Sequence, residues 1–225
     1  KIDKKINNLS LSSNRTYIVK SAANASYMLS DTFIKLKPDL ILILGDRYET
    51  HSAAITALLM NIPIAHIHGG EITEGAVDEQ IRHSITKMSY LHFCSTETYR
   101  KRIIQMGEEP SRVFNSGAPG IDNIKNMKMM KKSELEKELN WKLGSKNILF
   151  TYHPTTLKDK KIGNEIKSIL NSLSKFDFHI LFTYANADYG GNVINKHLEI
   201  FCKRNVNKYM FKIFKIIFIN LNKTI

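Results

Sequence analysis

Ionisable residues follow directly after two apolar runs of the chain, at 39–44 and 63–68. Both runs are predicted as strands, and the unbroken apolar stretch of the first is typical of a strand buried on both faces. Asp46 lies just past the first run, and Glu71 just past the second. In an open parallel sheet, ligands bind outside the carboxyl ends of the strands. We therefore expect an active site at this edge.

The first cluster is the motif GDRYE at 45–49. Gly45 lets the backbone turn off the strand, so that Asp46 lies at the sheet edge. Arg47 offers a planar fork of donors that suits a phosphate or a carboxylate. Beside Arg47, Asp46 is expected to stay ionised unless it is deeply buried. The alternative is a structural pair of Asp46 and Arg47 that closes the strand.

The second cluster is the motif HIHGGE at 66–71. His66 and His68 are two residues apart on a strand, so they are expected to face the same side. With Glu71 they could bind zinc or iron, although no further ligand is evident. They could instead serve as general acid and base beside a phosphate pocket. For His66 itself, a hydrogen-bonded core histidine is the favoured interpretation.

The third cluster opens a predicted helix at 78–88, where Asp78 and Arg82, and Glu79 and His83, are spaced as i, i+4 pairs. Alone this pattern is typical of a solvated helix face. Because the helix follows HIHGGE so closely, Asp78 is expected to point back toward the same edge. A further histidine, His153, follows a predicted strand in the second half of the chain.

These clusters must be positioned by a regular alternation of elements. Strands are predicted over 39–44, 63–68, 90–95, 112–116, 147–152 and 178–184, and helices over 21–37, 50–60, 78–88, 96–106, 163–173 and 191–202. This alternation favours an α/β fold with parallel sheets. We predict a first domain at 1–124, a lysine-rich helical linker at 125–146 and a second domain at 147–225, with an atypical apolar and basic tail from about residue 210.

The net charge of +12 does not by itself indicate nucleic-acid binding. Much of it comes from 125–161, with ten Lys and four acidic residues, and from 196–225, with seven Lys or Arg and one Glu. No nucleic-acid motif accompanies it. No apolar run is long enough to span a membrane, and no signal peptide is evident. The two cysteines, Cys94 and Cys202, match no metal or redox motif, so reduced thiols and a cytoplasmic location are expected.

Four motifs in this order and spacing resemble the hydrolysing UDP-N-acetylglucosamine 2-epimerases of sialic-acid and related nonulosonic-acid synthesis. They are GDRYE, IPIAHIHGGEITEGAVDEQIRHSITKMSYLHF, MGEEPSRVFNSGAPGID and TYHPTTL. The resemblance implies a GT-B-like fold of two Rossmann-like domains with the active site in the cleft, both domains being incomplete here. The family's opening turn, expected before Lys1, and its later serine-rich segment are not found in the chain.

The resemblance also implies roles for particular residues. It gives catalytic roles to Asp46, His68, Glu71, Asp78 and His153. It gives substrate-binding roles to Arg47, Glu49, Arg82, His83, Ser116 and Gly117. Many relatives have glutamate in place of His68, and the HIHGGE form is found in a subset that resembles enzymes for diacetamido-trideoxy sugars. The acid/base role is therefore divided between His68 and Glu71.

In the reaction that the resemblance implies, a base removes the proton at C2 of the sugar while UDP leaves from C1, and water then adds to the glycal. The implied substrate is UDP-N-acetylglucosamine or, as an alternative, its diacetamido-trideoxy analogue. No cofactor and no metal are implied, and a homo-oligomer is possible. The chain could also be a glycosyltransferase of the same fold, or an inactive, truncated binding module. Truncation is expected to impair activity.

Overall fold

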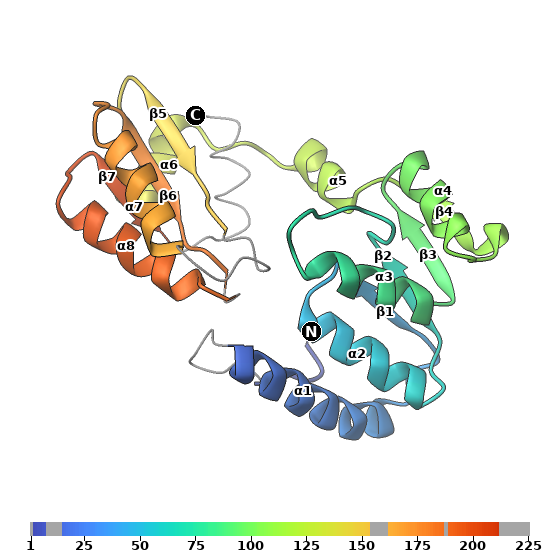
Figure 1. The fold of residues 1–225 in the computed structure, drawn as a ribbon. Coiled ribbons are helices and arrows are strands. Elements are labelled where there is room, and N and C mark those ends of the chain that lie inside the picture. The colour runs from blue at the N-terminus through green and yellow to red at the C-terminus, as the bar shows by residue number, and fades with distance from the viewer. Residues whose placement is uncertain (1, 8–14, 154–161, 187–188, 212–225) are drawn as a thin grey trace. The chain divides into compact units, whose positions relative to one another are not determined.

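The computed structural model describes residues 2–7, 15–153, 162–186 and 189–211. Within these ranges the chain divides into two compact units, Lys1–Asn123 and Ile124–Ile225, and each is described by itself (Figure 1). Each unit is built on a parallel sheet, as the alternation of strands and helices predicts. No helix among the described residues is both long enough and apolar enough to cross a membrane.

The first unit contains four parallel strands in the order β1-β2-β3-β4. The strands are β1 (Ile41–Leu44), β2 (Ile64–Ile67), β3 (Leu91–Cys94) and β4 (Val113–Asn115). The helices are α1 (Arg15–Leu36), α2 (Tyr48–Leu59), α3 (Asp78–Met88), α4 (Glu97–Gln105), the 3-10 helix η1 (Pro110–Arg112) and α5 (Pro119–Asn126). Because all four strands run the same way, their carboxyl ends share one edge.

Small residues let the helices of this unit lie close to the sheet. Ala54 and Ala57 of α2 are fully buried against Phe33, Ile64 and Ile85. Burial of such apolar surface is the main favourable term in folding. This packing holds α2 and α3 against β1 and β2, and the ionisable clusters lie on the turns that enter these two helices.

The edge strand β1 differs from the prediction of burial on both faces. Its residues alternate between half-buried and exposed, and Leu42 and Leu44 are both exposed. Successive side chains of a strand point to opposite faces, so Leu42 and Leu44 lie on one exposed face of β1, which is also the outermost strand of the described sheet. The unbroken apolar run therefore predicted the strand correctly and its burial incorrectly.

The second unit contains three parallel strands, β5 (Asn147–Phe150), β6 (His179–Thr183) and β7 (Lys208–Phe211). Its helices are α6 (Lys132–Leu139), α7 (Ile162–Leu173) and α8 (Gly191–Lys203). α7 and α8 cover one face of β6, around Ile180 and Phe182, and α6 covers the other, around Leu181. Buried strands with helices on both faces are typical of parallel sheets.

Two segments of this unit differ from the sequence predictions. The stretch 125–146 is not one continuous helix, since α5 ends at Asn126 and α6 begins at Lys132. It also contributes Leu135 and Leu139, both buried, to the core of the second unit. β7 was not predicted, because the apolar and basic run from about 210 showed no regular pattern. The rest of that run, 212–225, lies outside the described residues.

Candidate active site

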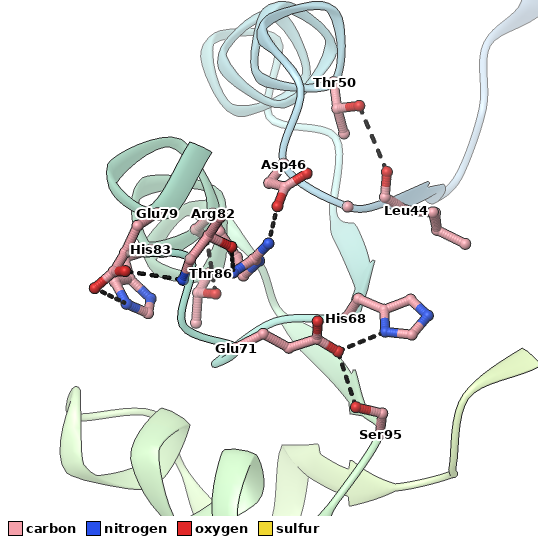
Figure 2. Close-up of polar contacts among 12 residues, drawn as sticks. Leu44, Asp46, Thr50, His68, Glu71, Glu79, Arg82, His83, Thr86 and Ser95 are labelled. Carbon is pink, nitrogen blue, oxygen red and sulfur yellow. Dashed lines mark hydrogen bonds and ion pairs between the residues drawn. The ribbon is translucent and has the colours of Figure 1, made fainter. Parts of the chain in front are cut away.

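Polar side chains follow the carboxyl ends of neighbouring strands in the first unit. Asp46 comes two residues after β1, His68 directly after β2 and Ser95 directly after β3. The fourth strand, β4, is followed by Ser116, which is exposed. Figure 2 shows the contacts that connect the first three of these positions with α3 and with the loop before it. The edge is therefore lined by polar residues from separate parts of the sequence.

Asp46 is held by Arg82, which reaches it from α3. The Nη2 atom of Arg82 donates to Oδ2 of Asp46 (Figure 2). Its Nη1 atom donates to Oγ1 of Thr73 over 2.9 Å. The side chain of Arg82 is only 7% exposed, whereas that of Asp46 is 21% exposed. Burial lowers the pKa of Arg82 from its ordinary value. A buried arginine thus presents a carboxylate that solvent still reaches.

Two arginines of this region bind carboxylates. Arg47 donates to both carboxylate oxygens of Glu49 over 3.1 and 3.2 Å. Arg82, which is spaced as an i, i+4 pair with Asp78, reaches from α3 to the turn after β1. The pairing follows from the packing of α3 against the sheet, which helical spacing alone does not describe.

His68 and Glu71 form a close pair at the centre of the edge. The distance between Nδ1 of His68 and Oε1 of Glu71 is 2.6 Å, and the same oxygen accepts a hydrogen bond from Oγ of Ser95 over 2.8 Å (Figure 2). The side chains of His68 and Glu71 are 24% and 25% exposed. Glu71 therefore connects residues that follow two neighbouring strands.

His66 is a core histidine, as the favoured interpretation held. It is fully buried, its Nε2 lies 2.9 Å from the carbonyl oxygen of Gly45, and its Nδ1 lies 3.4 Å from Oγ1 of Thr86. Burial lowers the pKa of His66 to about 4, so the ring is neutral near pH 7. Among the described residues, no group of three or more His, Cys, Asp or Glu side chains is arranged to bind a metal ion.

His66 and His68 were expected to face the same side of one strand, but only His66 belongs to β2. β2 ends at Ile67, and His68 lies beyond it with a φ of 66°. This left-handed backbone conformation is uncommon for a residue with a side chain. The alternation of a regular strand therefore stops before His68.

The third cluster lies at the start of α3, which begins at Asp78 as predicted. Glu79 accepts a hydrogen bond from the backbone nitrogen of Thr73 over 2.9 Å, and its other oxygen lies 3.9 Å from Nε2 of His83. The i, i+4 relation of Glu79 and His83 is therefore present. Burial lowers the pKa of His83. These contacts attach the loop after HIHGGE to the helix.

Three further predicted residues are found at strand ends. Ser116 and Gly117 follow β4, and the backbone nitrogen of Ser116 donates to the carbonyl oxygen of Cys94 over 3.0 Å. His153 follows β5 in the second unit, where it is exposed and its Nδ1 lies 3.5 Å from the backbone nitrogen of Asn186. The proposal that His153 contributes to the same site stays a prediction.

Sequence reasoning missed Ser95 and Thr73. Ser95 had a usable signal, because it is a polar residue directly after a predicted strand at the same sheet edge. Thr73 lies in a loop without regular structure, and nothing in its neighbourhood pointed to Arg82.

Comparisons with known proteins show which proteins the chain resembles. A relative from Campylobacter jejuni, described as "GDP/UDP-N,N'-diacetylbacillosamine 2-epimerase (hydrolyzing)", is 48% identical over 209 residues, covering 92% of this chain and 54% of the relative. The "Polysialic acid biosynthesis protein P7" of Escherichia coli is 41% identical over 202 residues, covering 88% of this chain and 51% of the relative. The chain thus spans about half the length of these curated relatives.

The fold has solved counterparts. A crystal structure of UDP-GlcNAc 2-epimerase from Neisseria meningitidis bound to UDP-GlcNAc matches with a TM-score of 0.78 at 22% identity, covering 98% of this chain and 61% of that one. The fold is therefore GT-B-like, with two Rossmann-like parallel sheets. The family model described as UDP-N-acetylglucosamine 2-epimerase matches residues 1–215. The chain belongs to the UDP-N-acetylglucosamine 2-epimerase family.

Proposed function

We propose that this protein is a hydrolysing 2-epimerase whose substrate is a UDP-linked 2,4-diacetamido-trideoxy-glucose. The observation that carries the proposal is the 48% identity, over 92% of the chain, to a relative whose name specifies hydrolysing 2-epimerisation of N,N'-diacetylbacillosamine. A second relative with that sugar in its name, from Legionella pneumophila, is 35% identical over 170 residues. The HIHGGE motif agrees with this choice.

The proposed reaction needs groups that move protons at C1 and C2 of the sugar. A base removes the C2 proton while UDP departs from C1, and water then adds to the glycal on the opposite face to give the free 2-epimer. The C2 proton is a poor acid, so the base must be positioned within hydrogen-bonding distance and protected from bulk water. Asp46, His68 and Asp78 are the groups we assign to proton transfer, because they come from three elements that meet at one sheet edge.

The departing diphosphate needs positive charge. Arg82 is buried and engaged with Asp46 and Thr73, so we assign it the role of positioning Asp46. Arg47 also pairs with a carboxylate, that of Glu49, but it is 36% exposed and presents its guanidinium near the N-terminus of α2. A guanidinium and a helix N-terminus both favour an anion, so we assign the diphosphate to Arg47 and the start of α2.

UDP-N-acetylglucosamine is the second candidate substrate. A relative named "UDP-N-acetylglucosamine 2-epimerase" from Neisseria meningitidis is 29% identical over 164 residues. The two substrates share the 2-acetamido group and UDP, and they differ at C4 and C6. One assay can therefore rank them.

The test is incubation of the 225-residue chain with each UDP-sugar, with free UDP as the readout. We expect faster UDP release from the diacetamido-trideoxy substrate, and deuterium at C2 of the product when the reaction runs in D2O. Asp46→Asn is the control for background hydrolysis. UDP release from neither substrate above that control would contradict the proposal. Full activity in Asp78→Asn would favour the glycosyltransferase alternative.

A further inference from the structure

His68, Glu71 and Ser95 form a chain of two hydrogen bonds that meet at one atom. Oε1 of Glu71 accepts from Oγ of Ser95 over 2.8 Å and lies 2.6 Å from Nδ1 of His68 (Figure 2). An ionised carboxylate can only accept hydrogen bonds. When Glu71 is ionised, the hydrogen between His68 and Glu71 belongs to Nδ1, and in the neutral ring the lone pair is on Nε2.

The backbone between His68 and Glu71 fixes this arrangement. The backbone nitrogen of His68 donates to the carbonyl oxygen of Phe93 over 3.0 Å, which holds its left-handed conformation beside β3. A Cβ atom on Gly69 would lie 3.1 Å from Nδ1 of His66 and 3.1 Å from Oγ1 of Thr86. The turn is thus packed closely enough to return Glu71 to His68, three residues earlier in the chain.

His66 provides an internal contrast. Its Nε2 donates to the carbonyl oxygen of Gly45 over 2.9 Å, because a carbonyl oxygen can only accept. His66 therefore carries its hydrogen on Nε2 and His68 carries it on Nδ1. The two histidines are two residues apart and are expected to be opposite tautomers.

We propose that Ser95 and Glu71 are positioning residues, which hold His68 in the Nδ1–H tautomer and direct its Nε2 toward the sugar for proton transfer. This inference rests on the proposed function and deepens it, since it adds an orienting role for Glu71 to the proton-transfer role assigned to His68. Ser95 acts through Glu71, because its hydroxyl holds the carboxylate oxygen that His68 needs.

The first test is spectroscopic and does not depend on catalysis. In the chain labelled with 15N-histidine, two-bond 1H–15N spectra at alkaline pH report which ring nitrogen is protonated, and His68→Gln identifies the His68 signals. We expect Nδ1–H for His68 and Nε2–H for His66. In Ser95→Ala we expect the His68 signals to shift toward a mixture of tautomers. An Nε2–H tautomer for His68 in the unmodified chain would overturn the inference.

The second test is kinetic. Ser95→Ala is expected to lower kcat about ten-fold with little change in KM, since a hydrogen bond to a charged group is lost while substrate contacts remain. Ser95→Thr keeps the hydroxyl and is expected to restore most of kcat. The control is Ser111→Ala, because Ser111 also donates to a glutamate, Glu109, over 3.4 Å, but lies exposed before β4 at the other end of the sheet.

The two proposals fail in different ways. If the unmodified chain released no UDP, the proposed function would be contradicted. The tautomer of His68 could still be measured, and it would show whether Glu71 and Ser95 orient His68 as proposed. If UDP were released and Ser95→Ala kept both kcat and the His68 tautomer, the positioning role would be overturned. If Ser95→Ala did not fold, Glu71→Gln would supply the comparison, because it removes the charge of the carboxylate that accepts from Ser95 and His68.

Discussion

Two of the histidine–glutamate pairs in the first unit have very different surroundings. His68 and Glu71 are 2.6 Å apart at the carboxyl edge of the sheet, and both side chains are about one quarter exposed. His92 and Glu108 are 3.2 Å apart, and His92 is 1% exposed. The third member is the hydroxyl of Ser95 in the first pair, and in the second it is the ammonium of Lys87.

The difference shows how the surroundings of a pair decide its role. A pair that a ligand can reach is suited to reaction, whereas a buried pair serves as an anchor, which attaches one element to another. Lys87 also donates to the carbonyl oxygen of Met106 over 3.0 Å, so the His92 pair attaches α3 to the end of α4. Burial lowers the pKa of His92, which leaves the ring neutral and inaccessible. At the carboxyl edge, His68 keeps a ring nitrogen within reach of a ligand. Substitutions in both pairs and around them can test this contrast.

The largest effect is expected from replacing each histidine in turn. His68→Gln should lower kcat by roughly 10²–10⁴-fold, the usual contribution of a general acid or base. His92→Gln should leave kcat nearly unchanged but lower the thermal midpoint, because Glu108 loses a buried partner. Steady-state UDP release and scanning fluorimetry measure the two outcomes. Similar kinetic losses in both variants would remove the contrast.

Replacing Arg82 tests whether a residue at the carboxyl edge also stabilises the first unit. Arg82→Met removes the arginine that holds Asp46, and we expect the free energy of unfolding to fall by about 3 kcal/mol. The matched variant is Glu97→Gln, which breaks an exposed pair with Arg100 and should cost less than about 1 kcal/mol. Hydrogen exchange of the β1–β4 amides is the suitable measurement, since the one tryptophan, Trp141, belongs to the second unit. Equal losses would contradict the assignment of Arg82 as an anchor.

His66 lies next to the pair of His68 and Glu71 in the sequence but is buried like His92. The pH dependence of stability can test whether His66 titrates as a buried histidine. Its pKa is about 4 in the folded chain and 6.5 as the ordinary value, so the unfolded chain binds the proton first as pH falls. Its stabilising effect is complete above pH 6.5 and is lost between 6.5 and 4, amounting to about 3 kcal/mol.

Urea unfolding at several pH values compares the chain with His66→Gln, which keeps a donor for the carbonyl oxygen of Gly45. The variant should show a shallower loss of stability over this pH range. An identical pH dependence in both proteins would show that His66 does not titrate as its burial requires.

The smallest effect separates backbone strain from packing. Gly70 and Gly117 have the same φ of 77°, but a Cβ atom on Gly70 would lie 2.6 Å from the carbonyl oxygen of Tyr99, whereas Gly117 has open space. Gly117→Ala should lower the free energy of unfolding by about 1 kcal/mol, the cost of the left-handed conformation alone. Gly70→Ala should cost more and also lower kcat, because it displaces Glu71. Equal losses, measured by hydrogen exchange, would indicate that the turn relaxes freely.

Much of the fold was predictable from local patterns. The α3 helix was predicted from residue 78 to 88 and observed from Asp78 to Met88. Its polar and apolar residues alternate with the period of a helix and not with that of a strand. The strand β7 could not be predicted in this way, since its four residues are followed by an apolar and basic run without turn signals. The α6 helix looked like part of a linker, because its buried leucines stand among lysines and glutamates.

The sequence by itself determined which strands end in ionisable residues, since parallel strands separated by helices must gather their carboxyl ends at one edge. It left the partners of these residues open. Tertiary structure decided that Asp46 is held by Arg82 and that Glu71 joins His68 to Ser95. Such contacts connect residues up to 36 positions apart, and they depend on how α3 and β3 pack beside β2. No periodicity along the chain encodes these distances.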